Sequence, residues 1–300
     1  MGDMVTQEQL DNILREPERW KAIERNPLET DDLRFVSGAG ENFEKIVLSD
    51  TQVPEKRIRK LVILDTETTG ITADAELIEL AFCVCSYDVR TKEVLSIDCL
   101  FDAFSKPEKE LSEEIQQLTG IRPEMLKKRL MWEDFAEYLP ERCLVVAHNA
   151  SFDRRIFEKT FNRPESWDLH WTDSLTEIRW TEKGYKAKNL EMLAYLCGYW
   201  YQAHRAINDV LMLLQVLKAT QTLRELCEAA AQVSLEIEVK CSFDDKEQIK
   251  AAGFRWRSEG KSWVKVYRAM ADWERERQVL PRSVKVVGSQ VLNSQTRFKN

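Results

Sequence analysis

The chain has 300 residues, a length typical of two domains or of one large domain. Apolar residues make up 43% of it and charged residues 32%, which excludes a disordered or collagen-like chain. No apolar run reaches the roughly 18 residues of a membrane-spanning helix, and no signal peptide is visible, so we expect a cytoplasmic protein with no membrane partner. The seven cysteines form no CxxC pair and are typical of buried thiols in a reducing compartment.

The total charge of −7 is unevenly distributed along the chain. Residues 1–57 have a net charge of −5, residues 58–232 of −7, and residues 233–300 of +5. The last twenty residues contain four basic and no acidic side chains. A basic end on an acidic body permits local contact with a polyanion, although a solvated, disordered end fits the same composition.

The segment before the first apolar strand, residues 1–57, is predicted to be a helical and irregular extension. Apolar spacing within residues 7–25 favours one or two short helices. Residues 26–57 are polar and turn-rich, which favours a linker or an irregular wrap. An acidic wrap over the next domain and a partner-binding arm both fit this extension.

Residues 58–232 are predicted to form one α/β domain. We expect strands at residues 61–65, 77–88, 94–102, 143–149 and 169–174, the second and third of them as an antiparallel pair. We expect helices at residues 112–121, 151–161, 188–198 and, as one long element, 205–230. This alternation predicts a mixed sheet flanked by helices, although the strand order cannot be read from the sequence.

The C-terminal part is predicted to be a small α+β module, residues 233–280, followed by a basic tail, residues 281–300. The module has a strand, then a helix ending at Gly253, then a hairpin around Ser-Glu-Gly. About 35 residues are too few for an independent core. We therefore expect it to pack on the main domain or to be completed by residues 269–280.

Three short segments carry acidic residues in positions that favour catalysis. Asp65 and Glu67 end the first apolar strand, where residues i and i+2 share one face. Asp153 follows the strand that ends near His148 and begins the next helix, where an acid stabilising the helix N-terminus is the simpler interpretation. His204 and Asp209 converge only if His204 lies in the loop before a helix, because five helical residues turn through about 500°.

Together these segments contain four carboxylates and a histidine, the composition of a metal-dependent hydrolase site. Carboxylate oxygens suit Mg²⁺ or Mn²⁺, and four of them balance two divalent cations. A metal pair about 3.5–4 Å apart stabilises both oxygens of an in-line displacement at phosphorus.

The segments LDTETTG, AHNASFD and HRAINDV resemble the three motifs of the DEDDh (DnaQ-like) 3′–5′ exonuclease superfamily. That superfamily includes the proofreading epsilon subunit of bacterial DNA polymerase III. The resemblance covers about residues 59–220 and leaves both ends of the chain unexplained. It implies a ribonuclease H-like fold and a nuclease that releases 5′-mononucleotides from a 3′ end.

The resemblance also implies roles for individual residues. Asp65, Glu67 and Asp209 would hold the two metals, Asp153 would hold the second metal, and His204 would deprotonate the attacking water. The residues implied to bind the terminal nucleotide are Thr66, Thr68, Thr69, Asn149 and Phe152. For Phe152, a place in the core is an equal alternative.

Two further stretches are candidates for contact with nucleic acid. Trp180 to Lys188 alternates aromatic and lysine residues, but a solvated loop around a packed tryptophan is the favoured interpretation. In the C-terminal module four cations are candidates for phosphate contact, and Trp256 and Trp263 are expected in the core. The four cations are Arg255, Arg257, Lys261 and Lys265.

The leading functional hypothesis is a 3′–5′ exonuclease acting on DNA. The same chemistry on RNA is the close alternative, because the motifs do not recognise the 2′ position of the sugar. A catalytically silent nucleic-acid-binding adaptor is a third hypothesis, disfavoured because all five catalytic positions are filled. A DNA polymerase or another replication or repair protein is a candidate partner, and a free-standing nuclease fits equally well.

Overall fold

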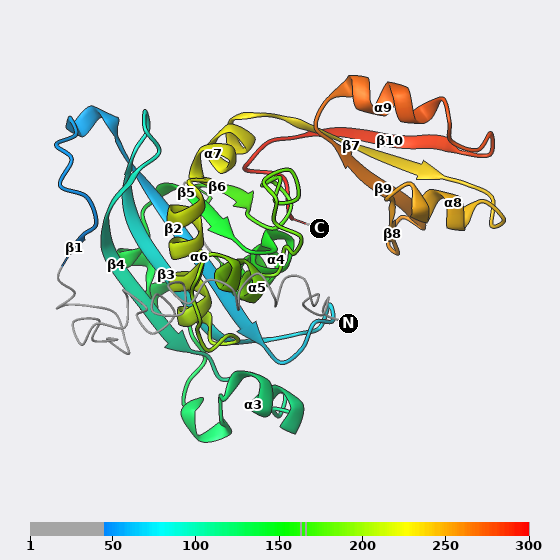
Figure 1. Cartoon of the computed structure of the whole chain (residues 1–300). Coiled ribbons are helices and arrows are strands. Elements are labelled where there is room, and N and C mark those ends of the chain that lie inside the picture. Colours follow the sequence, from blue (N-terminus) through cyan, green and yellow to red (C-terminus); the bar gives the residue numbers. More distant parts are fainter. Residues whose placement is uncertain (1–44, 163, 166, 300) are drawn as a thin grey trace, which may run out of the picture. The chain divides into compact units, whose positions relative to one another are not determined.

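The computed structural model describes residues 45–162, 164–165 and 167–299, which form two compact units (Figure 1). The first unit extends to Cys227 and includes Phe298, and the second is Glu228–Arg297. The helices expected at residues 7–25 lie outside the described residues. Among the described helices, none combines the length and apolar character needed to cross a membrane.

The first unit contains a mixed six-stranded sheet in the order β1-β4-β3-β2-β5-β6. Its strands are β1 (Ile46–Val47), β2 (Ile58–Thr68), β3 (Leu77–Asp88), β4 (Val94–Phe104), β5 (Arg142–Ala147) and β6 (Asp168–Asp173). The pairs β1/β4, β3/β4 and β2/β3 are antiparallel, whereas β2/β5 and β5/β6 are parallel. The predicted mixed sheet is therefore confirmed, and β1 is an additional short edge strand within the expected linker.

The helices of the first unit confirm most of the predicted ones. They are α3 (Glu113–Thr119), α4 (Ala150–Thr160), α5 (Leu190–Leu196), α6 (Ala206–Thr220) and α7 (Leu223–Ala231), the last of which crosses into the second unit. Four short 3₁₀ turns accompany them: η1 (Glu55–Arg57), η2 (Pro123–Met125), η3 (Trp132–Asp134) and η4 (Ala136–Tyr138). The hydroxyl of Ser112 caps α3 by accepting from the Ile115 backbone N–H at 3.2 Å.

The single long helix predicted for residues 205–230 is wrong, because the chain forms α6 and α7 with a break between them. Gln221 adopts a left-handed φ of 54° that ends α6. The Thr220 hydroxyl donates to the Val216 carbonyl at 2.7 Å and also contacts the Thr222 hydroxyl at 2.8 Å. Threonine hydroxyls that bond locally in this way compete with the helical pattern.

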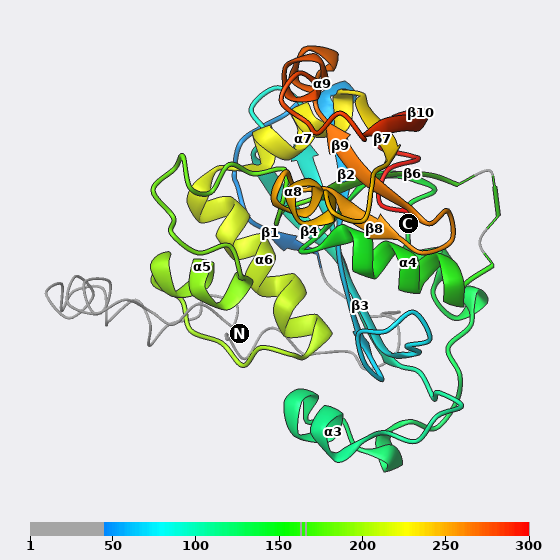
Figure 2. The same ribbon diagram turned by 90° about the vertical axis from the view of Figure 1, so that its right-hand side faces the viewer.

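Helices cover both faces of the sheet (Figure 2). Helix α6 packs on β2, β3 and β4, and α4 packs on β2, β5 and β6 from the opposite face. Every residue of β3 is buried, as expected of a central strand. Strand β2 is therefore held between two helices, and each helix brings its N-terminal turn to the same end of β2.

The second unit contains an antiparallel sheet in the order β10-β7-β9-β8, with two helices. Its elements are β7 (Ser234–Lys240), α8 (Lys246–Ala251), β8 (Arg255–Arg257), β9 (Ser262–Tyr267), α9 (Met270–Arg277) and β10 (Lys285–Leu292). The predicted strand, helix and hairpin are present. The interpretation of residues 281–300 as a disordered end is wrong, because β10 pairs along β7 from Lys285 to Leu292.

An aromatic cluster beneath α4 stabilises the first unit and supports this helix. Phe135 is fully buried, and its ring lies 4.8 Å from that of Phe161 and 6.1 Å from that of Phe157. Trp132 approaches the same ring at 5.2 Å. Phe157 and Asp153 lie on the same helix, so this packing also fixes a proposed site residue.

We predict that Phe135→Ala lowers the free energy of unfolding by about 3–5 kcal/mol, because it leaves a cavity among buried rings. Chemical denaturation measures this change. Leu118→Ala is the control, because that side chain is 50% exposed on α3 and its loss should change stability by less than about 0.5 kcal/mol. Equal effects of the two substitutions would contradict the proposed importance of the cluster.

Candidate active site

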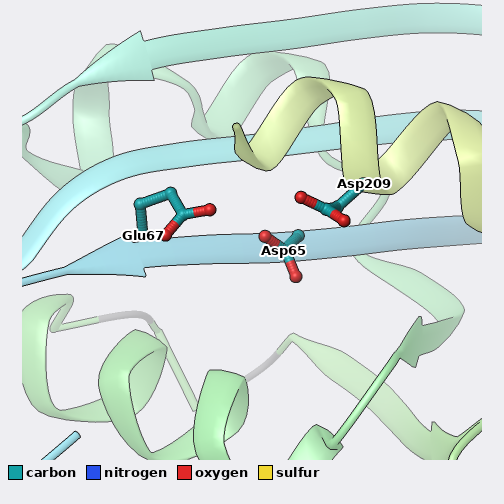
Figure 3. A group of neighbouring side chains, drawn as sticks. All are labelled: Asp65, Glu67 and Asp209. Carbon is teal, nitrogen blue, oxygen red and sulfur yellow. The ribbon is translucent and has the colours of Figure 1, made fainter. Parts of the chain in front are cut away.

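Three carboxylates from two elements meet at the end of β2 (Figure 3). Asp65 and Glu67 project from one face of β2, and Asp209 projects toward them from the start of α6. Their side chains each offer an oxygen, and these oxygens all lie within 4.8 Å of one another. The chain thus concentrates negative charge at one point on a buried strand.

The loop before α6 brings His204 and Asp209 together, as the sequence required. His204 has a left-handed φ of 64° and lies outside the helix, which begins at Ala206. Its backbone N–H donates to Asp209 Oδ2 at 2.9 Å. The other oxygen of Asp209 accepts from the Tyr201 hydroxyl at 2.7 Å, so both ends of this loop are tied to one carboxylate.

Asp153 joins α4 to β2. One of its carboxylate oxygens accepts from the Thr66 backbone N–H at 3.1 Å and from the Thr66 hydroxyl at 2.8 Å. The carboxyl group is buried and faces the same cavity as the three clustered acids. Thr66 therefore orients Asp153 in addition to lining the cavity.

An open cavity of about 410 Å³ collects most of the residues singled out from the sequence. Those that line it are Asp65, Thr66, Glu67, Asn149, Phe152, Asp153, His204 and Asp209. Thr68 and Thr69 lie outside this lining. The Thr68 hydroxyl donates to the Gly70 carbonyl at 2.6 Å, and the Thr69 hydroxyl accepts from the Glu76 N–H at 3.0 Å, so both stabilise the β2–β3 turn.

Some residues at the site were not identified from the sequence. Tyr201, Glu191 and His148 also line the cavity. His148 lies in the segment AHNASFD, and its Nδ1 lies 2.8 Å from the Ser174 hydroxyl oxygen. Tyr201 and Glu191 have no local signal, because their proximity to Asp209 depends on how α5 and the following loop fold back.

Burial and mutual repulsion raise the pKa values of these carboxyl groups. Burial raises the pKa of Asp65 well above its ordinary value, and the charges of Asp153, Asp209 and Glu67 raise it further. Burial, then the charge of Asp209, raises the pKa of Glu67 to about 8. Burial likewise raises the pKa of Asp153 to about 7 and that of Asp209 to about 6, against the lowering effect of their hydrogen bonds.

This arrangement fits a divalent cation. The carboxylates that line this cavity repel one another when ionised, and burial together with that repulsion raises the pKa of Glu67. A cation among them favours the ionised form, and carboxylate oxygens are the preferred ligands of Mg²⁺ and Mn²⁺. Asp65, Glu67 and Asp209 are the residues placed to hold it.

Comparison with protein families decides the class of this site. Residues 62–217 match the model of the exonuclease family RNase_T. This range includes all of β3 and α4 and most of β2 and α6. The chain belongs to this exonuclease family. It thereby belongs to the DEDDh (DnaQ-like) superfamily, and the first unit is a nuclease domain with a ribonuclease H-like fold.

The curated relatives of this exonuclease domain include the PolC-type DNA polymerase III of two bacteria. The protein of Thermotoga petrophila is 30% identical over 162 residues, which are 52% of this chain and 11% of the relative. That of Staphylococcus haemolyticus is 33% identical over 176 residues, 55% of this chain and 12% of the relative. The chain spans about a tenth of the length of these relatives.

Solved structures with a similar chain path include two nucleases. Exonuclease X in complex with 5′ overhanging duplex DNA is 21% identical and covers 56% of this chain and 98% of its own, with a TM-score of 0.41. The nuclease domain of 3′hExo, a DEDDh family member, bound to rAMP, is 16% identical and covers 58% of this chain and 96% of its own, with a TM-score of 0.43.

The two other stretches considered for nucleic-acid contact differ from expectation in part. Trp180 is fully buried and donates from Nε1 to the Ser174 carbonyl at 2.7 Å, as the packed-tryptophan interpretation predicted. In the second unit, Arg257 pairs with Glu236 at 2.7 Å.

Lys265 in the same unit pairs with Glu276 at 2.6 Å. Arg255 and Lys261 are exposed. Trp256 was expected in the core and is 53% exposed, because it lies on the three-residue edge strand β8.

The pKa of Glu67 yields a prediction about stability without added metal. Its folded-state pKa of about 8 exceeds its ordinary value of 4.5, so the folded state binds more protons between these pH values. The free energy of unfolding should therefore fall as pH rises from about 5 to about 8, by up to about 1.4 kcal/mol per unit of pKa difference. Denaturation at a series of pH values, with EDTA present, measures this slope.

Glu67→Gln should flatten the slope, and Mn²⁺ at about 100 times its dissociation constant should add about 2.7 kcal/mol near pH 8. The matched control Glu113→Gln removes an exposed charge on α3 and should leave the slope unchanged. A stability that rises over this pH range in EDTA would contradict the assignment.

Proposed function

We propose that this exonuclease domain hydrolyses the 3′-terminal phosphodiester bond of DNA and releases 5′-mononucleotides. One observation carries the proposal: carboxylate oxygens of Asp65, Glu67 and Asp209 converge within 4.8 Å, in a cavity that His204 also lines. This is the composition of a site that places a divalent cation next to a proton acceptor. The exonuclease family match supports the reaction class.

Two divalent cations, Mg²⁺ or Mn²⁺, are proposed as cofactors. Asp65, Glu67 and Asp209 would hold the two cations, and Asp153 would be a further ligand of the second. When bound, such cations supply charge stabilisation for the attacking and leaving oxygens at phosphorus. The chain contributes the ordering of these ligands, because Thr66 holds Asp153 while Tyr201 holds Asp209.

His204 is proposed as the general base. This residue is exposed on the loop and lines the cavity, and its backbone N–H donates to the carboxylate of Asp209. Imidazole accepts and releases protons near neutral pH, which suits removal of a proton from the attacking water. The left-handed backbone of this residue supports a specific placement, since non-glycine residues rarely adopt it without a structural reason.

DNA is the proposed substrate, because the curated relatives over this domain are named as DNA polymerases. For the same reason, a DNA polymerase or another replication or repair protein is the proposed partner. Asn149 and Phe152 line the cavity and are proposed to contact the terminal nucleotide, together with Thr66. Thr68 and Thr69 are proposed to act by shaping the turn. A cytoplasmic location stays a prediction.

Cleavage assays test the reaction, its direction and the choice between DNA and RNA. With 5′-labelled single- and double-stranded DNA and RNA, we expect stepwise shortening from the 3′ end in Mg²⁺ or Mn²⁺, and none in EDTA. Asp65→Asn should lower kcat by about 10³-fold or more. The substitution removes a negative charge that helps to hold the cations, and the cations supply several kcal/mol of transition-state stabilisation. His204→Ala should lower kcat by about 10²–10⁴-fold.

Glu113→Gln, an exposed carboxylate on α3, is the matched control and should leave kcat unchanged. Faster shortening of RNA than of DNA would assign the domain to RNA. Release from the 5′ end would overturn the proposed direction. An intact fold with no cleavage of any substrate would favour a nucleic-acid-binding adaptor.

The second unit is proposed to contact the phosphate backbone through Arg255 and Lys261, both of which are exposed. Replacing both cations by alanine should weaken DNA binding and lower the slope of log K against log salt by about 2, one unit for each phosphate contact. The matched control is Arg277→Ala, an exposed cation on α9. Equal slopes for the double variant and the wild type would exclude these contacts.

A further inference from the structure

A further buried acid, Glu79 on β3, lies beside the proposed catalytic carboxylates but is bound to protein groups instead. It is fully buried, and it is the direct cross-strand partner of Glu67. The metal-ligand cluster found among the described residues comprises Asp65, Glu67 and Asp209 and does not extend to Glu79. The role of Glu79 therefore depends on the protein groups that it contacts.

Those partners include two residues of the segment that carries His204. The Arg205 guanidinium donates to both oxygens of Glu79, with Nη2–Oε1 at 2.8 Å and Nε contacts at 3.1 and 3.2 Å. The backbone N–H of Ala206 donates to Oε2 at 3.0 Å. One buried carboxylate thus holds two consecutive residues, the first of which follows His204 directly.

The contacts fix the backbone on both sides of the left-handed turn. Arg205 is the N-cap residue of α6, whose side chain makes no cap hydrogen bond, so Glu79 supplies an acceptor for the unpaired helix N–H groups. On the other side, the backbone N–H of His204 donates to Asp209 Oδ2. His204 is therefore clamped between two carboxylates that come from different elements.

Other groups surround the Arg205 guanidinium and limit its movement. The Arg205 Cζ lies 5.2 Å from the centre of the Phe104 ring, and Nη2 lies 3.9 Å from Asp102 Oδ2. Both residues are on β4, the neighbour of β3. Buried ion pairs contribute little net stability compared with apolar packing, so a network of this kind is better explained by orientation than by stability.

We infer that Glu79 is a positioning residue of the exonuclease reaction, which places His204 through Arg205 and the backbone of Ala206. The inference rests on the proposed role of His204 as general base. Glu79 is not proposed to contact the substrate or the reacting atoms. Its contribution is the geometry of the loop, and a displacement of about 1 Å at a catalytic group costs about 10²-fold in rate.

The test is a double-mutant cycle with an isosteric substitution. Glu79→Gln retains the shape of the side chain and removes the charge that holds Arg205. We expect kcat on a short DNA oligonucleotide to fall by about 10²-fold, with KM changed by less than about threefold. In a His204→Ala background the same substitution should change kcat by less than about twofold, because its effect passes through His204.

Asp88→Asn is the matched control, because Asp88 is also buried on β3 and pairs with an arginine, Arg57, at the other end of the strand. It should lower stability and leave kcat unchanged. Arg205→Lys, which keeps the charge but not the paired contacts, should recover part of the activity lost in Arg205→Gln. Effects of Glu79→Gln and His204→Ala that multiply would overturn the inference.

Hydrogen–deuterium exchange of folded wild type and Glu79→Gln keeps the test independent of activity. Residues 199–206 should lose protection in the variant, while α4 and β5 keep theirs. If the wild type cleaves nothing, the proposed function fails and the exchange experiment still decides the clamp. Unchanged protection of residues 199–206 would overturn the inference whether or not the enzyme is active.

Discussion

The mutual repulsion of carboxylates on a buried strand is the constraint around which the first unit is organised. Asp65 and Glu67 share one face of β2, and the chain adds Asp209 from α6 within 4.8 Å of them. Burial itself disfavours the ionised form, and the neighbouring charges add to this effect, so the pKa of Glu67 rises to about 8. A fold that concentrates charge in this way must hold the side chains by other interactions, because the acids themselves push the elements apart.

The acids of this region divide into two groups according to their partners. Glu79 is neutralised by the guanidinium of Arg205 and by a helix N–H, so its charge is satisfied by the protein. Asp65 and Glu67 line a cavity instead, where the proposed cation would balance their charge. Asp209 belongs to both groups, since it accepts from Tyr201 and His204 while an oxygen remains close to the other two acids.

The sequence predicted what depends on local pattern and failed where distant partners decide. The apolar run before Asp65 and the i, i+2 spacing placed both acids on one face, and helix geometry required His204 to lie in a loop. The break at Gln221 escaped prediction because glutamine carries no turn signal. Strand β10 escaped because an edge strand pairs through its backbone and needs no apolar stripe. Glu79 was missed because its partner Arg205 lies 126 residues away. Tyr201 was missed because an irregular loop, which has no periodic pattern, brings it to Asp209.

The same reasoning explains why residue type alone misjudged the second unit. From the sequence, four cations there were equal candidates for phosphate contact. In the structure, Arg257 pairs with Glu236 on β7, and Lys265 pairs with Glu276 on α9. An ion pair that already satisfies a cation must be broken before phosphate can bind, whereas an exposed cation only exchanges water and counterions. Glu236 and Glu276 lie 21 and 11 residues from those cations in the sequence. Only the fold therefore distinguishes the paired cations from the exposed ones. The division of charge between structural pairs and available groups is therefore the shared principle of both units.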